Sequence, residues 1–257
     1  MSLGTVRFLG TGTSHGVPMI GCRCDVCRSA DPRDRRSRPS IYLTLSDNTR
    51  LLVDTTPDLR TQALACDLDR VDAILFTHCH ADHVMGLDEV RRFNVLQNAS
   101  VPCYGDRVTL EEIRRTFAYI FEAADEGGGI PKITLHPVDA PFAIGAHTIV
   151  PVPVLHGRRP IFGYRVGAFA YLTDCSAIPD ESWRLLEGLD TLVIDALRHR
   201  PHRSHFTVAG ALAVIERCGP RRALLTHICH DLPHAATGAM LPRGVEMAYD
   251  GLAVEIE

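Results

Sequence analysis

The stretch Thr77-His78-Cys79-His80-Ala81-Asp82-His83 constrains this chain more than any other part of its sequence. It places three histidines and one aspartate within six residues, directly after an apolar run at residues 73–76. Such a run predicts a buried strand, so we expect the polar cluster on the loop that leaves it. Imidazole nitrogens and carboxylate oxygens are the usual ligands of Zn²⁺ and similar cations. Because one cation takes three or four ligands, the cluster can begin two adjacent metal sites.

Three more candidate ligands each follow a predicted strand later in the chain. His156 follows residues 149–155, Asp174 follows residues 170–173, and His227 follows residues 223–226. Taken singly, each of them is more often a structural residue than a ligand. Rigid strands can, however, aim several loops at one point. The sequence therefore supplies enough further ligands to complete a two-metal site.

Short apolar runs recur along the chain and predict a protein with many strands and a few helices. Runs bounded by Gly, Pro, Asp or Asn predict strands at residues 5–9, 41–45, 51–54, 73–76, 147–154, 162–166, 169–173, 191–195, 223–226 and 252–256. Helices are predicted at residues 57–65, 88–97, 110–121, 180–187 and 207–218; the last ends at Gly219-Pro220. This mixture favours layered sheets covered by helices, in one domain spanning residues 1–257.

The order His-x-His-x-Asp-His, then His, then Asp, then His, each at a strand end, resembles the metallo-β-lactamase superfamily of metal-dependent hydrolases. The resemblance implies a mixed α/β (α+β) fold, a four-layer αββα sandwich with a two-metal site at one edge of the sheets. It also implies two ligand sets and a bridge between them: one metal bound by His78, His80 and His156, the other by Asp82, His83 and His227, and both by Asp174.

The bridging role suits a carboxylate, which has two oxygens and can join cations about 3.5–4 Å apart. Its negative charge also lowers the repulsion between the two cations. A hydroxide shared by the metals is then available near neutral pH, because metal binding lowers the pKa of water to about 7. We expect two divalent metals, Zn²⁺ or Mn²⁺; such ligand sets also accept Fe²⁺.

The stretch Gly21-Cys22-Arg23-Cys24-Asp25-Val26-Cys27 holds three of the nine cysteines. The spacing C-x-C-x-x-C places three thiolates on a short turn, which suits a closed tetrahedral Zn²⁺ site that needs one more ligand. His230, three residues after His227, is the best fourth ligand, so one loop could serve both centres. Disulfide chemistry is the alternative, but clustered cysteines in a cytosolic chain favour a structural Zn²⁺.

This cysteine cluster, with the preceding stretch Gly10-Thr11-Gly12-Thr13-Ser14-His15-Gly16-Val17-Pro18, narrows the resemblance to one subgroup. That subgroup contains the phosphoribosyl 1,2-cyclic phosphate phosphodiesterase of phosphonate breakdown, and the similarity runs from about Val6 to the C-terminus. It implies that His205, in the basic stretch at residues 197–205, acts as general acid or contacts phosphate. We place Asp174 and Asp82 with His205 as catalytic residues, and we expect Thr13, Ser14 and His205 to contact the substrate.

We therefore predict a dinuclear metal-dependent phosphodiesterase that hydrolyses a small or cyclic phosphodiester with a metal-bridging hydroxide. The alternatives are another hydrolase of the same fold, namely a tRNA 3′-processing nuclease, a thioesterase or a lactonase, and a metal-binding protein without activity. A net charge of −4 disfavours nucleic acid as a partner. The sequence leaves a homodimer open, and residues 122–129 form a surface turn or, as the alternative, a lid.

No apolar run approaches the roughly 20 residues of a membrane span, so no membrane partner is expected. The start Met1-Ser2-Leu3-Gly4 lacks the basic region and apolar core of a signal peptide, so we expect a cytoplasmic protein.

Overall fold

The computed structural model describes residues 2–122 and 129–257, which contain two mixed sheets of seven strands each. In the first sheet the order is β14-β1-β2-β3-β4-β5-β6, and in the second it is β13-β12-β11-β10-β9-β8-β7. The first comprises β1 (Gly4–Gly10), β2 (Ser40–Leu45), β3 (Arg50–Val53), β4 (Ala73–Leu75), β5 (Val101–Gly105), β6 (Ile133–Pro137) and β14 (Ala253–Ile256). The second comprises β7 (Phe142–Ile144), β8 (His147–His156), β9 (Arg159–Val166), β10 (Phe169–Leu172), β11 (Thr191–Asp195), β12 (Arg222–Thr226) and β13 (Val245–Met247).

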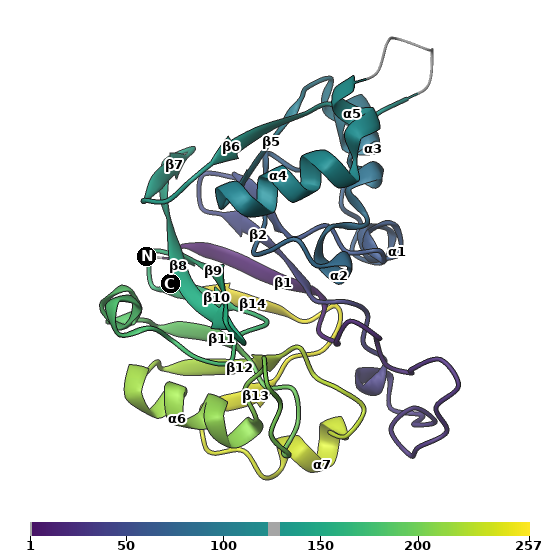
Figure 1. The fold of residues 1–257 in the computed structure, drawn as a ribbon. Helices are drawn as coiled ribbons and strands as arrows, with labels where there is room; N and C mark the ends of the chain where they lie inside the picture. Colours follow the sequence, from purple (N-terminus) through teal and green to yellow (C-terminus); the bar gives the residue numbers. More distant parts are fainter. Residues whose placement is uncertain (1, 123–128) are drawn as a thin grey trace.

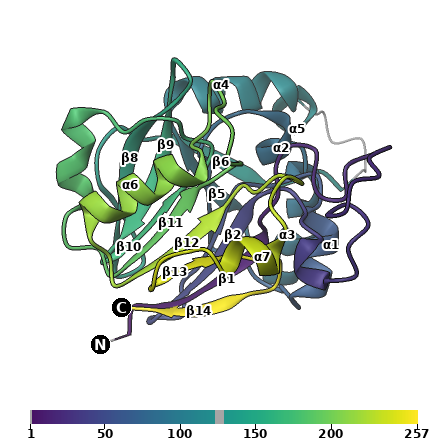
Figure 2. The ribbon, with the colours of Figure 1, turned by 90° about the horizontal axis from the view of Figure 1, so that it is seen from below.

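Helices cover the outer face of each sheet, as Figure 1 shows and Figure 2 confirms from below. The first sheet carries α1 (Leu59–Ala65), α2 (Ala81–Val84), α3 (Val90–Gln97), α4 (Arg107–Thr116) and α5 (Ala118–Glu122). The second carries α6 (Val208–Cys218), α7 (His234–Gly238) and a 3-10 helix at Asp180–Leu186. Two further 3-10 turns are Pro32–Asp34 and Leu87–Glu89.

Three apolar layers hold these elements together. One lies between the sheets, where side chains such as Phe8 and Leu43 meet Tyr171 and Val193. A second layer packs the first sheet against its helices, and a third packs the second sheet against α6 and the 3-10 helix Asp180–Leu186. Because burial of apolar area is the main driving force of folding, these layers define the architecture. The αββα sandwich expected from the sequence is confirmed.

Several element predictions need correction. Four strands were not predicted from the sequence. The reasons are that β5 contains a proline, β6 is mostly exposed, and β7 and β13 have only three residues each. The helix expected at residues 110–121 is two helices, since Phe117 departs from helical geometry at φ −114° and ψ 43°. Residues 180–187 form a 3-10 helix. The metal cluster does not lie wholly on a loop, because Asp82 and His83 belong to the short helix α2.

The turn or lid predicted at residues 122–129 lies outside the described residues at positions 123–128, and it stays a prediction. Among the described residues, no helix has both the length and the apolar character that crossing a membrane requires.

Strand direction brings the candidate site residues to one edge of the sandwich. Strands β10, β11 and β12 pair in parallel, so their carboxyl ends meet at the same edge. Asp174 lies just beyond β10, Asp195 ends β11, and His227 follows β12 directly. The first sheet reaches the same edge at Thr11, just after β1. The carbonyl of Thr11 accepts a hydrogen bond of 2.8 Å from the amide of Ile228, just after β12 of the second sheet. The site therefore lies where the two sheets meet.

Candidate metal centre

All seven predicted active-site ligands come together in two groups. Within each group the potential ligand atoms lie within 4.8 Å of one another. The first group consists of His78, His80, His156 and Asp174, and the second of Asp82, His83, Asp174 and His227. Only Asp174 is common to both, which is the position of a bridging carboxylate.

The two oxygens of Asp174 face different groups. Oδ2 lies 3.6 Å from His78 Nε2 of the first group. Oδ1 lies 2.8 Å from His227 Nε2 and 3.2 Å from His83 Nε2 of the second group. A carboxylate with one oxygen turned to each ligand set can contribute to both sites without moving.

Backbone strain accompanies this arrangement. Asp54, Asp174 and His227 have φ values of 65°, 54° and 57°, in the left-handed region that residues other than glycine rarely adopt. Such conformations cost free energy and persist where the surrounding structure enforces them, often at functional sites. Here they turn two predicted ligands and one supporting carboxylate toward the same point.

Hydrogen bonds fix which imidazole nitrogen is left for a metal. The Nδ1 of His83 lies 2.7 Å from a carboxylate oxygen of Asp54, and Nδ1 of His156 lies 2.7 Å from the carbonyl of Asp174. Both oxygens can only accept, so each Nδ1 carries the proton. The Thr77 hydroxyl donates to Asp54 over 2.8 Å and can accept from His78 Nδ1, 3.1 Å away. In all three histidines Nε2 is then the nitrogen with a free lone pair, as metal binding requires.

The donor set fits divalent cations. His78 Nε2, Asp82 Oδ2, His83 Nε2 and His227 Nε2 are buried, and among the described residues they form no hydrogen bond of acceptable geometry. The three histidine nitrogens nevertheless lie 2.8–3.6 Å from oxygens of Asp174. Leaving such atoms unpaired is costly, and a cation shared by several of them satisfies them together. The residues present are therefore suited to hold two metals, and their roles as ligands stay a prediction.

Charge within the site points the same way. Burial alone would lower the pKa of His83, but the carboxylates of Asp174, Asp54 and Asp82 outweigh it and raise that pKa well above its usual value. Burial likewise opposes charge on His227, yet Asp174 and other acceptors raise its pKa to about 10. The buried carboxylates thus hold positive charge beside them, and divalent cations can supply that charge.

The four predicted ligands of the structural zinc also lie together. The Sγ atoms of Cys22, Cys24 and Cys27 lie 3.2, 3.4 and 3.6 Å from His230 Nδ1. A Cys₃His set with these atoms around one point is suited to a closed tetrahedral Zn²⁺ site. The three cysteines come from the loop after β1, and His230 comes from the loop after β12, so the set links two distant parts of the chain.

Arg36 supports the same loop, a role that the sequence did not reveal. Its fully buried guanidinium donates to the carbonyls of Cys229 (2.9 Å) and Leu232 (2.8 Å), on either side of His230, and to Asp34 (2.9 Å). These bonds hold the backbone that carries both His227 and His230. No local pattern indicates the role, because the carbonyl acceptors lie nearly two hundred residues away in the chain.

His205 lies beside the metal groups, as the sequence predicted. Its ring centroid is 4.9 Å from that of His156 and 4.7 Å from that of His227. Its Nδ1 is 3.2 Å from Oδ2 of Asp195, a fully buried carboxylate at the end of β11 that was not among the predicted site residues. The only signal for Asp195 was its place at the end of the predicted strand 191–195. Burial, followed by the nearby His227, lowers the pKa of His205 to about 4.

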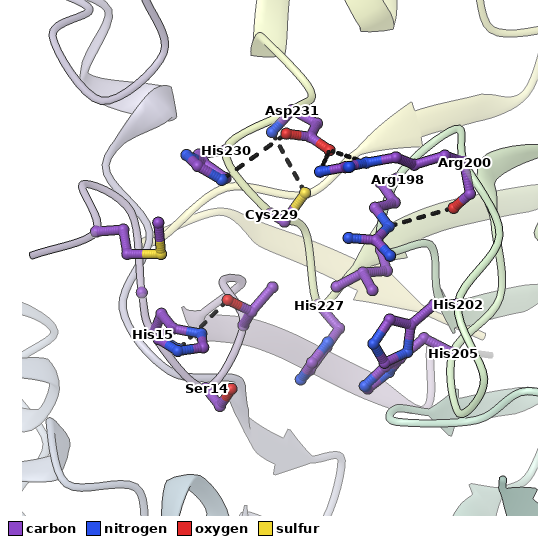
Figure 3. A pocket seen from close by; sticks show the side chains of 14 residues that line it. Ser14, His15, Arg198, Arg200, His202, His205, His227, Cys229, His230 and Asp231 are labelled. Carbon is purple, nitrogen blue, oxygen red and sulfur yellow. Dashed lines mark hydrogen bonds and ion pairs between the residues drawn. The ribbon is translucent and has the colours of Figure 1, made fainter. Parts of the chain in front are cut away.

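A cavity of about 270 Å³ opens from this side of the metal groups (Figure 3). Thr13 and Ser14 line it together with His205 and His227, so the predicted substrate contacts border the same space. The cavity continues past these residues to the basic loop at residues 197–205 and to His230.

Comparison with known proteins identifies the family. A profile described as Beta-lactamase superfamily domain matches residues 49–228. The chain belongs to this superfamily. The chain is also similar to a protein of known structure, a new diphosphatase from the PhnP family, which is 44% identical, with a TM-score of 0.92 over 99% of this chain and 98% of that one. Together with the ligand clusters, these similarities show that this protein is a metal-dependent hydrolase.

Two other relatives extend the comparison. An octanoyltransferase from Porphyromonas gingivalis is 38% identical over 97% of this chain, but the chain spans only 51% of that protein's length. Zn²⁺-bound PqqB from Methylobacterium extorquens is 20% identical with a TM-score of 0.81, covering 98% of this chain and 100% of that one. At that identity, the similarity to PqqB shows the fold alone.

Proposed function

We propose that this hydrolase is a phosphodiesterase acting on a small or cyclic phosphodiester, similar to a phosphoribosyl cyclic phosphate. The observation that carries the proposal is the position of His205, whose ring lies within 5 Å of one histidine of each metal group. A proton donor beside two adjacent cation sites suits phosphoryl chemistry, in which charge develops on the leaving oxygen. The cavity volume of about 270 Å³ favours a small substrate.

The two ligand groups would hold Zn²⁺ or Mn²⁺, and the Cys₃His set would hold Zn²⁺. When bound, the two active-site metals would neutralise charge on the phosphoryl oxygens and supply a nucleophile from water near neutral pH. Asp174 would keep both sites at a set separation, and Asp82 would complete the second. The hydroxyls of Thr13 and Ser14, at the cavity wall, would donate hydrogen bonds to the substrate.

His205 would give its proton to the leaving oxygen. Asp195 accepts from Nδ1 and leaves Nε2 as the nitrogen that handles this proton. Burial opposes the charged imidazolium, but a bound phosphodiester brings a negative charge next to it and favours the protonated form. His205 and the substrate anion therefore stabilise each other's charge within the same cavity.

A substrate panel tests the proposal. The purified protein is assayed with bis(p-nitrophenyl) phosphate, a 2′,3′-cyclic nucleotide, a diphosphate ester and an octanoyl thioester, with and without a chelator. We expect turnover of the phosphodiesters that the chelator abolishes and added Zn²⁺ or Mn²⁺ restores. The exposed Asp139→Ala variant serves as a control for the inactive Asp174→Ala variant. Turnover of the thioester without turnover of any phosphodiester would show the proposal to be wrong.

Hydrolysis of a diphosphate is the second candidate. It is favoured by the similarity to the diphosphatase, which extends over nearly the whole of both chains at 44% identity. The same residues would serve, because the attacked phosphorus and the leaving oxygen occupy equivalent places in both reactions. Turnover of the diphosphate ester alone would favour this candidate. The octanoyl thioester in the panel tests whether this protein acts on an octanoyl group, as the name of the octanoyltransferase relative would suggest.

A further inference from the structure

The loop after β1 forms a wall that two cavities share. Residues 13–16 of this loop line the cavity beside the metal groups, across from His205 (Figure 3). His15 also lines a second cavity of about 270 Å³, together with Arg38. Ser14 and His15 are exposed, so side-chain packing contributes little to the shape of this part of the loop. Hydrogen bonds must therefore fix the backbone that faces the substrate.

Arg38 supplies one of these bonds from the side of the second cavity. Its Nε donates to the carbonyl of Ser14 over 3.2 Å. Its Nη1 lies 3.1 and 3.2 Å from the two carboxylate oxygens of Asp58, and its backbone amide donates to the same carboxylate over 2.9 Å. Because the guanidinium is tied down in this way, it holds the Ser14 carbonyl with little further loss of conformational freedom.

This contact also sets the direction of the next backbone N–H. The peptide between Ser14 and His15 is trans, and a planar trans peptide directs its C=O and N–H to opposite sides. Since the carbonyl faces Arg38, the N–H of His15 faces away from Arg38. It lies 3.4 Å from the hydroxyl of Thr13, which lines the cavity beside the metal groups. A hydrogen bond of that length is weak, so the amide can donate to a ligand in this cavity.

We propose that the backbone N–H of His15 donates to a non-bridging oxygen of the phosphoryl group that is attacked, and that Arg38 is the positioning residue for this donor. This assignment rests on the proposed phosphodiesterase function. Backbone amides that are oriented before the anion arrives stabilise its charge without reorganisation. The amide adds a third donor to the hydroxyls of Thr13 and Ser14, on the side of the cavity across from His205.

Nuclear magnetic resonance tests the donor directly. The zinc-loaded, isotope-labelled protein is titrated with inorganic phosphate while the amide proton of His15 is followed. A hydrogen bond to an anion moves an amide proton downfield, so we expect a saturable downfield shift. In Arg38→Met this shift should be reduced, with the metal content unchanged. A His15 amide proton that does not move downfield, or one that moves equally in Arg38→Met, would overturn the assignment.

Hydrolysis of bis(p-nitrophenyl) phosphate gives the second measurement. Deleting a preorganised donor outright lowers kcat by about 100- to 1,000-fold, whereas Arg38→Met loosens the amide and leaves it in place, so kcat/KM should fall about 10-fold. Arg35→Met is the matched control, because Arg35 is exposed, lines the same second cavity and carries the same charge. It should leave kcat/KM and the His15 shift unchanged.

The outcomes separate this assignment from the proposed function. No loss of kcat/KM in Arg38→Met, or an equal loss in Arg35→Met, would overturn the role of Arg38, because the second result would trace the effect to charge alone. If the native protein hydrolyses no phosphodiester, the proposed function fails. The titration with inorganic phosphate then still decides whether the His15 amide binds a phosphoryl oxygen.

Discussion

Arg36→Met should destabilise this protein far more than an arginine substitution three residues earlier. The side chains of Arg36 and Asp34 are 0% and 6% exposed, and they form an ion pair at 2.9 Å. The guanidinium also donates to the carbonyls of Cys229 and Leu232 over 2.9 and 2.8 Å. Methionine fills much of the same volume but can donate no hydrogen bond.

The magnitude follows from what the substitution leaves behind. Removing one partner of a buried ion pair costs about 3–5 kcal/mol, because the remaining charge stays buried without compensation. The Asp34 carboxylate keeps one partner, the amide of His234 at 2.8 Å, which places the expected cost at the lower end of that range. Since a domain has only about 5–15 kcal/mol of stability, Arg36→Met should remove a large part of it.

Urea denaturation followed by circular dichroism measures this cost, with Arg33→Met as the control. Arg33 pairs with Asp31 at 2.8 Å, but the arginine side chain is 45% exposed and the aspartate 23%. Solvent screens exposed pairs, so Arg33→Met should change the free energy of unfolding far less than Arg36→Met does. Arg36→Met should also retain less zinc per chain, because the two lost bonds flank His230.

The double variant Asp34→Asn/Arg36→Met separates charge from packing. It removes the uncompensated carboxylate, so it should be more stable than Arg36→Met alone. If Arg36→Met cost no more than Arg33→Met, burial would not determine the strength of these pairs and the reasoning would be refuted. If the double variant were no more stable than Arg36→Met, the loss would come from the unpaired carbonyls of Cys229 and Leu232 and not from the charge of Asp34.

Three further predictions concern the metal bridge, a helix cap and a surface carboxylate. Asp174→Ala should lower the metal content by at least one ion per chain in elemental analysis and lower kcat by at least about 100-fold. Thr207→Ala should reduce the free energy of unfolding by about 1 kcal/mol, because the hydroxyl of Thr207 accepts from the amide of Gly210 at the start of α6. Hydrogen bonds from Arg221 hold the pKa of Asp190 below its usual value, so the ionised form stabilises the fold. The cost of Asp190→Asn should therefore be present at pH 7, at no more than about 1 kcal/mol, and should disappear as pH falls below about 4, as urea denaturation at several pH values would show.

Local patterns in the sequence predicted the elements whose formation depends on neighbouring residues. The helix expected at residues 207–218 is α6, capped by Thr207 and ended by Gly219 at φ 62°. The strand expected at residues 191–195 has the same bounds as β11. In both, the apolar spacing and the ends are contained in a short stretch, so no distant contact is needed to recognise them. The short strand β13 carries too little local pattern, and its pairing with β12 is what makes it a strand.

The supporting residues of the site were hidden for a related reason. Asp54 and Asp195 each end or follow a predicted strand, as many structural aspartates do, and nothing adjacent marks them. Asp54 meets His83 across 29 positions of sequence. Arg36 meets Leu232 across 196 positions. The first contact forms because β3 and β4 pair in parallel, and the second because loops that follow strands of the two sheets meet at one edge.

The amino-acid sequence by itself determined the kinds of ligand atoms, their order along the chain and the strands that carry them. Those properties depend on side-chain chemistry and on periodicity over a few residues. Only the tertiary structure decided that one oxygen of Asp174 faces each ligand group, which nitrogen of each histidine remains free, and which arginine of the basic loop pairs with Asp231. These depend on distances of a few ångströms between segments far apart in the chain, and such distances arise only when the layers pack.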